Sequence, residues 1–147
     1  MVGEEKLCMC RIMAIDYGLK RVGIAVTDPL QIIATPLTTI ASHTLFFFLK
    51  QYLQKEIVSI FVIGMPQGLD GKPSEMSKVM ERVGAKLKNA FPQQSVCYQD
   101  ERFTSQLAAQ GLYQAGYRKK DRQNKANIDK VSAAILLQSY LRTICVV

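Results

Sequence analysis

Acidic residues in this sequence fall at the ends of predicted elements, at three separate places in the chain. Asp16 closes the first apolar run, and the neighbours Asp100 and Glu101 end a later run of strand type. Asp129 lies in the first turn of the predicted C-terminal helix. Ligands of open sheets gather at strand ends, and a helix N-terminus adds partial positive charge, so these carboxylates can converge. Each acid also has a simpler interpretation as a turn residue, a helix-dipole charge or an ion-pair partner, and only their joint placement favours a shared site.

A cluster of carboxylates predicts a particular chemistry. The negative charges repel one another unless cations lie between them, so such a site calls for divalent metal. Ligands that are all oxygen favour Mg²⁺ or Mn²⁺. Two such ions roughly 3.5–4 Å apart activate a water molecule and stabilise the leaving oxygen in attack on a phosphodiester. The single His and the four Cys, which form no Cys-x-x-Cys pair, argue against zinc and suggest reduced thiols.

Basic residues concentrate in the C-terminal third of the chain. The net charge is +7, from 19 Lys and Arg against 12 Asp and Glu, and residues 117–130 hold six basic side chains against two Asp. A segment of this kind suits contact with nucleic-acid phosphates, whereas a solvated surface loop has the same composition. The candidate phosphate contacts are Lys119, Lys120, Arg122 and Lys125, together with Lys20, Arg21 and Arg102 beside the acidic positions.

Five apolar runs predict the strands of one α/β domain spanning residues 1–147. The first three predict an antiparallel meander, in which Pro36 places the third strand at an edge or beside a bulge. The last two predict parallel strands joined by helical crossovers, so the sheet is mixed and five-stranded. The predicted strands are 10–16, 22–27, 32–40, 57–65 and 95–100.

Helical spacing of apolar residues predicts four helices flanking this sheet. The first, with its LFFFL run, is apolar most of the way round and is expected to pack firmly on the sheet. Ser42, Ser74, Thr104 and Asn127 are the predicted N-caps, and Gly116 is a predicted C-cap. The predicted helices are 43–54, 75–89, 104–116 and 127–143.

Hydropathy and the N-terminal residues predict where in the cell the protein is located. No apolar run approaches the roughly 18–20 residues of a membrane span, so neither a span nor a membrane partner is expected. The first residues carry two Glu and lack the basic start and apolar stretch of a secretory signal. A cytoplasmic protein is therefore expected.

Four ordered segments together resemble a known family. They are IDYGLKRVGIAVTDP, VIGMPQGLDG, the tripeptide Asp100-Glu101-Arg102 with Thr104, and IDKVSAAILLQSYL. The sequence resembles the YqgF family of bacterial pre-16S rRNA nucleases, which have an RNase H-like fold and are related to Holliday-junction resolvases. The resemblance spans about residues 10–142, and several ordered motifs in one chain are more specific than any one of them.

The resemblance implies an activity and a set of site residues. It implies metal-dependent endonucleolytic cleavage in maturing the 5′ end of 16S rRNA, as part of ribosome biogenesis. By position, Asp16, Glu101 and Asp129 correspond to the catalytic ligands of Mg²⁺ or Mn²⁺, and Asp100 is a weaker alternative because neighbouring strand residues point to opposite sides. Two departures, Gly68 for a common asparagine and Ser105 for a second threonine, concern substrate contacts and remove no ligand.

Three other functions fit the same residues. A DNA junction resolvase would apply the same chemistry to branched DNA, because backbone contacts do not distinguish DNA from RNA. Dimerisation would favour that interpretation, since two symmetric cuts need two sites, and the sequence leaves the oligomeric state open. A non-catalytic rRNA-binding assembly factor would use only the basic segment. An actin-like ATPase or sugar kinase, which shares the Asp-x-Gly turn, is disfavoured because 147 residues leave no room for a second nucleotide-clamping domain.

Overall fold

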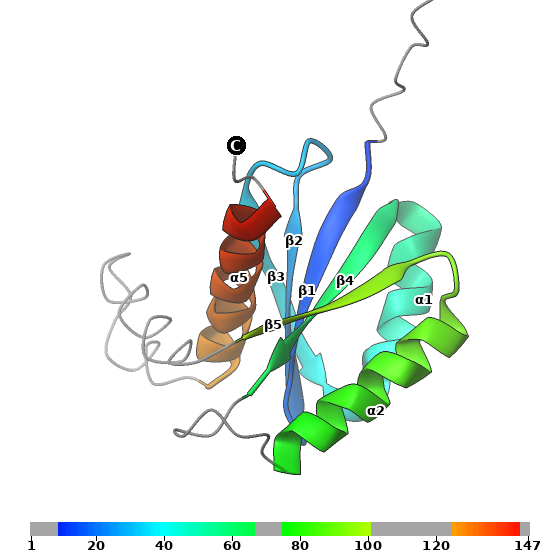
Figure 1. Ribbon diagram of the computed structural model, residues 1–147, viewed down its shortest axis with the longest axis vertical. Helices are drawn as coiled ribbons and strands as arrows, with labels where there is room; N and C mark the ends of the chain where they lie inside the picture. The colour runs from blue at the N-terminus through cyan, green and yellow to red at the C-terminus, as the bar shows by residue number, and fades with distance from the viewer. Residues whose placement is uncertain (1–8, 67–74, 101–124, 145–147) are drawn as a thin grey trace, which may run out of the picture.

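The computed structural model describes residues 9–66, 75–100 and 125–144. These residues form a five-stranded sheet with helices on both faces (Figure 1). The strands are β1 (Arg11–Tyr17), β2 (Arg21–Thr27), β3 (Ala34–Ala41), β4 (Val58–Met65) and β5 (Ser95–Asp100). The helices are α1 (Leu45–Lys55), α2 (Glu75–Ala90) and α5 (Lys125–Ile144), and a 3₁₀ turn at Ser42–Thr44 precedes α1.

The sheet is mixed, with strand order β3-β2-β1-β4-β5. β2 pairs antiparallel with both β1 and β3, while β4 pairs parallel with β1 and β5. The predicted fold class, an antiparallel meander extended by two parallel strands and flanked by helices, is confirmed. Both expectations for Pro36 hold as well, because β3 is an edge strand and its register with β2 shifts between Ile24 and Ala25. An edge tolerates proline since no further strand needs its missing N–H.

Side chains of the central strands alternate between two apolar clusters. Met13 and Ile15 of β1 pack in the cluster that includes Leu49 of α1 and Leu87 of α2. Ile12 and Ala14 face the other way, into a cluster with residues of α5. The two clusters lie on opposite faces of the sheet, and Figure 1 shows α1 and α2 on one side and α5 on the other. Because both faces are covered, the central strands are apolar almost throughout.

The start of the first helix differs from the prediction. The chain makes a 3₁₀ turn at Ser42–Thr44, and the α-helix begins at Leu45 with no side-chain cap. Ser42 is not the N-cap, because its hydroxyl donates instead to the carbonyl of Leu19 at 2.7 Å. The helix also packs on one side only: Leu45 and Leu49 are buried, whereas Phe47 is 65% exposed. The expectation that this helix packs firmly on the sheet is confirmed, although its apolar face extends beyond the buried side.

The last helix begins earlier than predicted. α5 starts at Lys125, so Asn127 lies within its first turn and is not the cap. The second helix and the fifth strand occupy Glu75–Ala90 and Ser95–Asp100, close to the predicted bounds. The predicted caps Ser74 and Thr104 and the helix predicted at 104–116 lie outside the described residues. Within the described part of the chain, no helix combines the length and hydropathy of a membrane span.

Candidate functional site

Asp16 lies near the end of β1, on the face of the sheet that α5 covers. Ile12 and Ala14 belong to the α5 cluster, and Asp16 follows them at the two-residue spacing that keeps strand side chains on one face. Its partner across the antiparallel pair is Gly23 of β2. Asp16 is neither fully buried nor fully exposed. The first acidic position is therefore next to the strand on which α5 packs most closely.

Gly23 is where the backbone of α5 meets the sheet. A Cβ added at Gly23 would overlap the carbonyl group of Asp129 and come within 3.0 Å of the Lys130 nitrogen. Only a residue without a side chain lets helix and strand approach this closely. This close approach places the first turn of α5, which carries Asp129, against Gly23. Gly23 is the residue that pairs with Asp16 across the two strands. Figure 1 shows the first turn of α5 at the same end of the molecule as the end of β1.

Asp129 is held by an arginine from the sheet. The Nε–H of Arg21 donates to Oδ2 of Asp129 at 2.9 Å, and the two side chains are 39% and 28% exposed. Arg21 precedes Gly23 by two residues on β2, so the two share the face toward α5. The guanidinium places positive charge against one of the predicted metal ligands.

The hairpin that carries Lys20 and Arg21 has a fixed backbone. The Gly18 N–H donates to the Arg21 carbonyl at 2.9 Å, and the Ser42 N–H donates to the Lys20 carbonyl at 3.0 Å. The side chain of Lys20 is exposed at the turn. Both candidate phosphate contacts therefore project from a hydrogen-bonded turn between the end of β1 and the start of β2.

Asp100 lies on the other face of the sheet from Asp129. On β5, the thiol of Cys97 meets the hydroxyl of Tyr140 from α5 at 3.7 Å, while Tyr98 reaches Gly84 of α2. Asp100 follows Tyr98 by two residues, so alternation gives it the α2 face, and it is exposed. Asp100 is therefore on the opposite face of the sheet from Asp16 and Asp129, the two acidic residues near Gly23.

The remaining candidates fall where the structure is not described. They are Glu101, Arg102, Lys119, Lys120 and Arg122, together with the side chain of Lys125. Among the residues that are described, no three His, Cys, Asp or Glu side chains are arranged to hold a metal ion. The predicted trio is not tested by that finding, because Glu101 is one of its members.

The described part of the site fits a hard divalent cation. Its acidic donors are carboxylate oxygens, the ligand type that Mg²⁺ and Mn²⁺ prefer. The Arg21 guanidinium already occupies one of them as a stand-in cation. The hydroxyl of Ser132, one helical turn beyond Asp129, is buried and has no hydrogen-bond partner within the described residues. A buried polar group without a partner, one turn from Asp129, is consistent with a site that holds further ligands.

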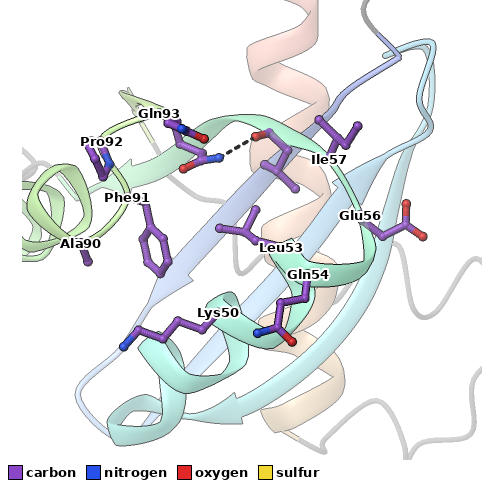
Figure 2. A pocket seen from close by; sticks show the side chains of 11 residues that line it. Lys50, Leu53, Gln54, Glu56, Ile57, Ala90, Phe91, Pro92 and Gln93 are labelled. Atoms are coloured by element: carbon purple, nitrogen blue, oxygen red, sulfur yellow. Dashed lines mark hydrogen bonds between the residues drawn. The ribbon is translucent and has the colours of Figure 1, made fainter.

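A pocket of about 550 Å³ lies at the opposite end of the sheet (Figure 2). It is bounded by the C-terminal ends of α1 and α2 and by Val58, the first residue of β4. Gln94 closes one side, where its Nε2 donates to the Val58 carbonyl at 3.2 Å. Since β1 and β4 run parallel and Asp16 is near the end of β1, this pocket is remote from the acidic positions.

The comparison with known families decides the relationship. The family model described as "RuvX: Holliday junction resolvase" matches residues 10–143. The chain belongs to the RuvX family. The family consists of hydrolases that act on phosphodiester bonds, and the five-stranded mixed sheet agrees with its RNase H-like fold.

Curated RuvX-family relatives match along nearly their full length. A protein of Amoebophilus asiaticus named "Putative pre-16S rRNA nuclease" is 52% identical over 133 residues, covering 90% of this chain and 94% of its own. Proteins with the same name from Flavobacterium psychrophilum and Bacteroides fragilis are 51% and 50% identical, covering 90% and 92% of this chain and 97% and 98% of theirs. The resemblance inferred from the four motifs is thereby confirmed.

Two features of this RuvX-family site were missed from the sequence. Gly23 stands alone within an apolar strand pattern, and that pattern is a known signal of close backbone approach. On α5, the small residues Ser132 and Ala133 are buried. Arg21 was considered only as a phosphate contact, and no local signal indicates its ion pair with Asp129.

Proposed function

We propose that this chain is an endonuclease dependent on Mg²⁺ or Mn²⁺ that cleaves the precursor of 16S rRNA at its 5′ end. The observation that carries the proposal is the contact of α5 with Gly23, the register partner of Asp16, at the turn that contains Asp129. The names of the curated relatives supply the substrate class.

In this proposal the residues have distinct roles. Asp16, Asp129 and Glu101 hold the metal, with Glu101 preferred to Asp100 because Asp100 lies on the α2 face. The bound ions would supply an activated water and positive charge at the leaving oxygen. Lys20 and Arg21, on the rigid hairpin, orient the scissile strand by its phosphates. Arg102, Lys119, Lys120, Arg122 and Lys125 bind the flanking backbone.

The proposed site also accounts for a need for metal. Carboxylates gathered at one site repel one another, and among the described residues Arg21 offsets the charge of Asp129. A phosphodiester brought to this position adds further negative charge. Divalent cations offset both, so metal and substrate are expected to bind together.

The description of the matched family supports a second candidate, cleavage of Holliday junctions. The same carboxylates would serve, because in-line attack on a phosphodiester is alike in RNA and DNA. Parallel assays on a precursor RNA spanning the 16S 5′ end and on a four-way DNA junction separate the two. Cleavage of the junction alone would overturn the RNA assignment and leave the metal site standing.

The metal-dependent mechanism is tested by Asp16→Asn, which keeps the shape of the side chain and removes its charge. We expect cleavage of the precursor RNA to fall at least about 100-fold, because lost metal binding costs several kcal/mol of transition-state stabilisation. Asp28→Asn is the matched control: it makes the same charge change at a partly exposed aspartate whose Oδ1 accepts the N–H groups of Ile32 and Ile33, both at 2.8 Å. Full activity of Asp16→Asn would refute the metal-dependent mechanism. If the wild type binds the RNA without cleaving it, the chain would instead be a non-catalytic assembly factor.

A further inference from the structure

Arg21 stands beside both described acidic positions of the site. Its Nε–H bonds Oδ2 of Asp129 at 2.9 Å. Asp16 is paired with Gly23, two residues further along β2, so Asp16 and Arg21 are diagonal neighbours on the face toward α5. Such neighbours in an antiparallel pair lie about 7–8 Å apart, within reach of a long side chain. The Arg21 side chain therefore contacts one predicted metal ligand and lies within reach of a second.

The ion pair is of a kind that a stronger ligand can displace. Arg21 and Asp129 remain 39% and 28% exposed, and ion pairs this accessible to water are weak. The backbone of Arg21, in contrast, is anchored by the hydrogen bond from the Gly18 N–H to its carbonyl. The guanidinium can consequently leave Asp129 while the rest of the residue stays beside the site.

We propose that Arg21 is a displaceable counterion of the metal site. Its guanidinium neutralises Asp129 and holds the carboxylate in place until a divalent cation binds that carboxylate. The released guanidinium then binds a phosphate of the nucleic acid. Arg21 is thus a positioning residue that couples metal binding to substrate binding. The inference rests on the proposed function, because it requires Asp129 to be a metal ligand.

The first test measures the binding of Mn²⁺ alone, by electron paramagnetic resonance, without nucleic acid. Arg21→Gln removes the competitor for Asp129, so we expect Mn²⁺ to bind roughly three- to tenfold more tightly than to the wild type. Arg21→Lys keeps the charge without the Nε–H geometry and should give an intermediate affinity.

A second arginine provides the matched control. Arg11 pairs through its Nε with Oε2 of Glu56 at 3.2 Å, at the start of β1. Arg11→Gln makes the same charge change about 17 Å along the strand from Asp16 and should leave the Mn²⁺ affinity within twofold of the wild type. Equal or weaker binding by Arg21→Gln overturns the inference alone. Absence of Mn²⁺ binding by the wild type overturns both the inference and the proposed metal site.

The second test asks whether Asp129 restrains Arg21 from phosphate, and it needs no metal. The affinity of a single-stranded RNA spanning the 16S 5′ junction is measured by fluorescence anisotropy in EDTA. Asp129→Asn should raise this affinity because it frees the guanidinium. The gain in affinity from Asp129→Asn should be at least about twofold smaller in the Arg21→Gln variant than in the wild type. Loss of the negative charge of Asp129 favours RNA binding equally in both proteins, so this general effect cancels in the double-mutant cycle. Equal gains in the two backgrounds would refute the release of Arg21 to phosphate.

Discussion

Tyr140 of α5 joins the last helix to the edge strand β5 through a polar contact. Its hydroxyl lies 3.7 Å from the Cys97 sulfur, among partly buried side chains. Burial raises the pKa of Tyr140 to about 12, with further contributions from its hydrogen bond to Cys97 and its electrostatic interaction with Cys97. A tyrosine in the unfolded chain titrates near pH 10. Folding therefore keeps this phenol protonated to higher pH than the unfolded chain does.

This difference makes the stability of the protein depend on pH in the alkaline range. Below about pH 10 the phenol is neutral in both states and its contribution is fully present, and it is lost as the pH rises from about 10 through 12. We expect the free energy of unfolding, measured by urea titration at several pH values, to fall over this range. Tyr140→Phe should fall less steeply, and identical slopes for the two proteins would contradict the assignment.

At the scale of elements, the site depends on the packing of α5 against β2. The helix contacts β2, β3 and β1, and its closest approach is at Gly23. The obstacle to a side chain there is the backbone of Asp129 and Lys130, which cannot turn aside. At Gly84 of α2 the obstacle is different, because an added Cβ would meet the hydroxyl end of Tyr98, a side chain that is 40% exposed.

These two glycines predict opposite outcomes for the same substitution. Gly23→Ala should lower the free energy of unfolding by roughly 3 kcal/mol, because α5 must move off the sheet, and should weaken Mn²⁺ binding by displacing Asp129. Gly84→Ala should change stability by less than about 1 kcal/mol in either direction, since the gain in helix propensity offsets the movement of Tyr98. Urea unfolding and Mn²⁺ titration of both variants check this. A mild Gly23→Ala would show that α5 is not held by this contact.

At the scale of the whole molecule, basic residues lie both near the proposed site and far from it. The net charge of +7 includes exposed lysines on α1 and α2, on the sheet face away from Asp129. The proposed RNA contacts lie instead near the start of α5 and in the preceding basic segment. Counterion release depends on cations that meet the phosphates and not on the total charge, so the two groups of lysines should behave differently.

Salt dependence of RNA binding measures that difference. Replacing Lys119, Lys120 and Arg122 with Gln takes the net charge from +7 to +4 and should reduce the slope of log K against log salt by roughly 2. The control replaces the exposed Lys50, Lys55 and Lys88 with Gln, which makes the same change in net charge on α1 and α2. Equal effects of the two triple variants would mean that the basic segment is no more than a solubilising surface.

The strands and most of the helices could be predicted from the sequence because each depends on periodicity within a short segment. Apolar runs located all five strands to within two residues, and their order predicted the meander and the parallel pair. The caps were less predictable. Ser42 and Asn127 are residue types that often cap helices, but whether a residue caps a helix depends on where the preceding chain lies. The Ser42 hydroxyl donates to the carbonyl of Leu19 instead, and α5 begins two residues before Asn127.

The sequence by itself determined the element order, the alternation of side chains along each strand and the concentration of positive charge toward the C-terminus. Only the tertiary structure decided that Arg21 pairs with Asp129 across 108 residues, that Gly23 admits the backbone of α5, and that Asp100 lies on the α2 face. The physical reason is the separation along the chain of the residues involved. Periodicity and composition are local properties of the chain, whereas contacts between distant residues depend on strand register and on the packing distance of a helix, which no short segment encodes.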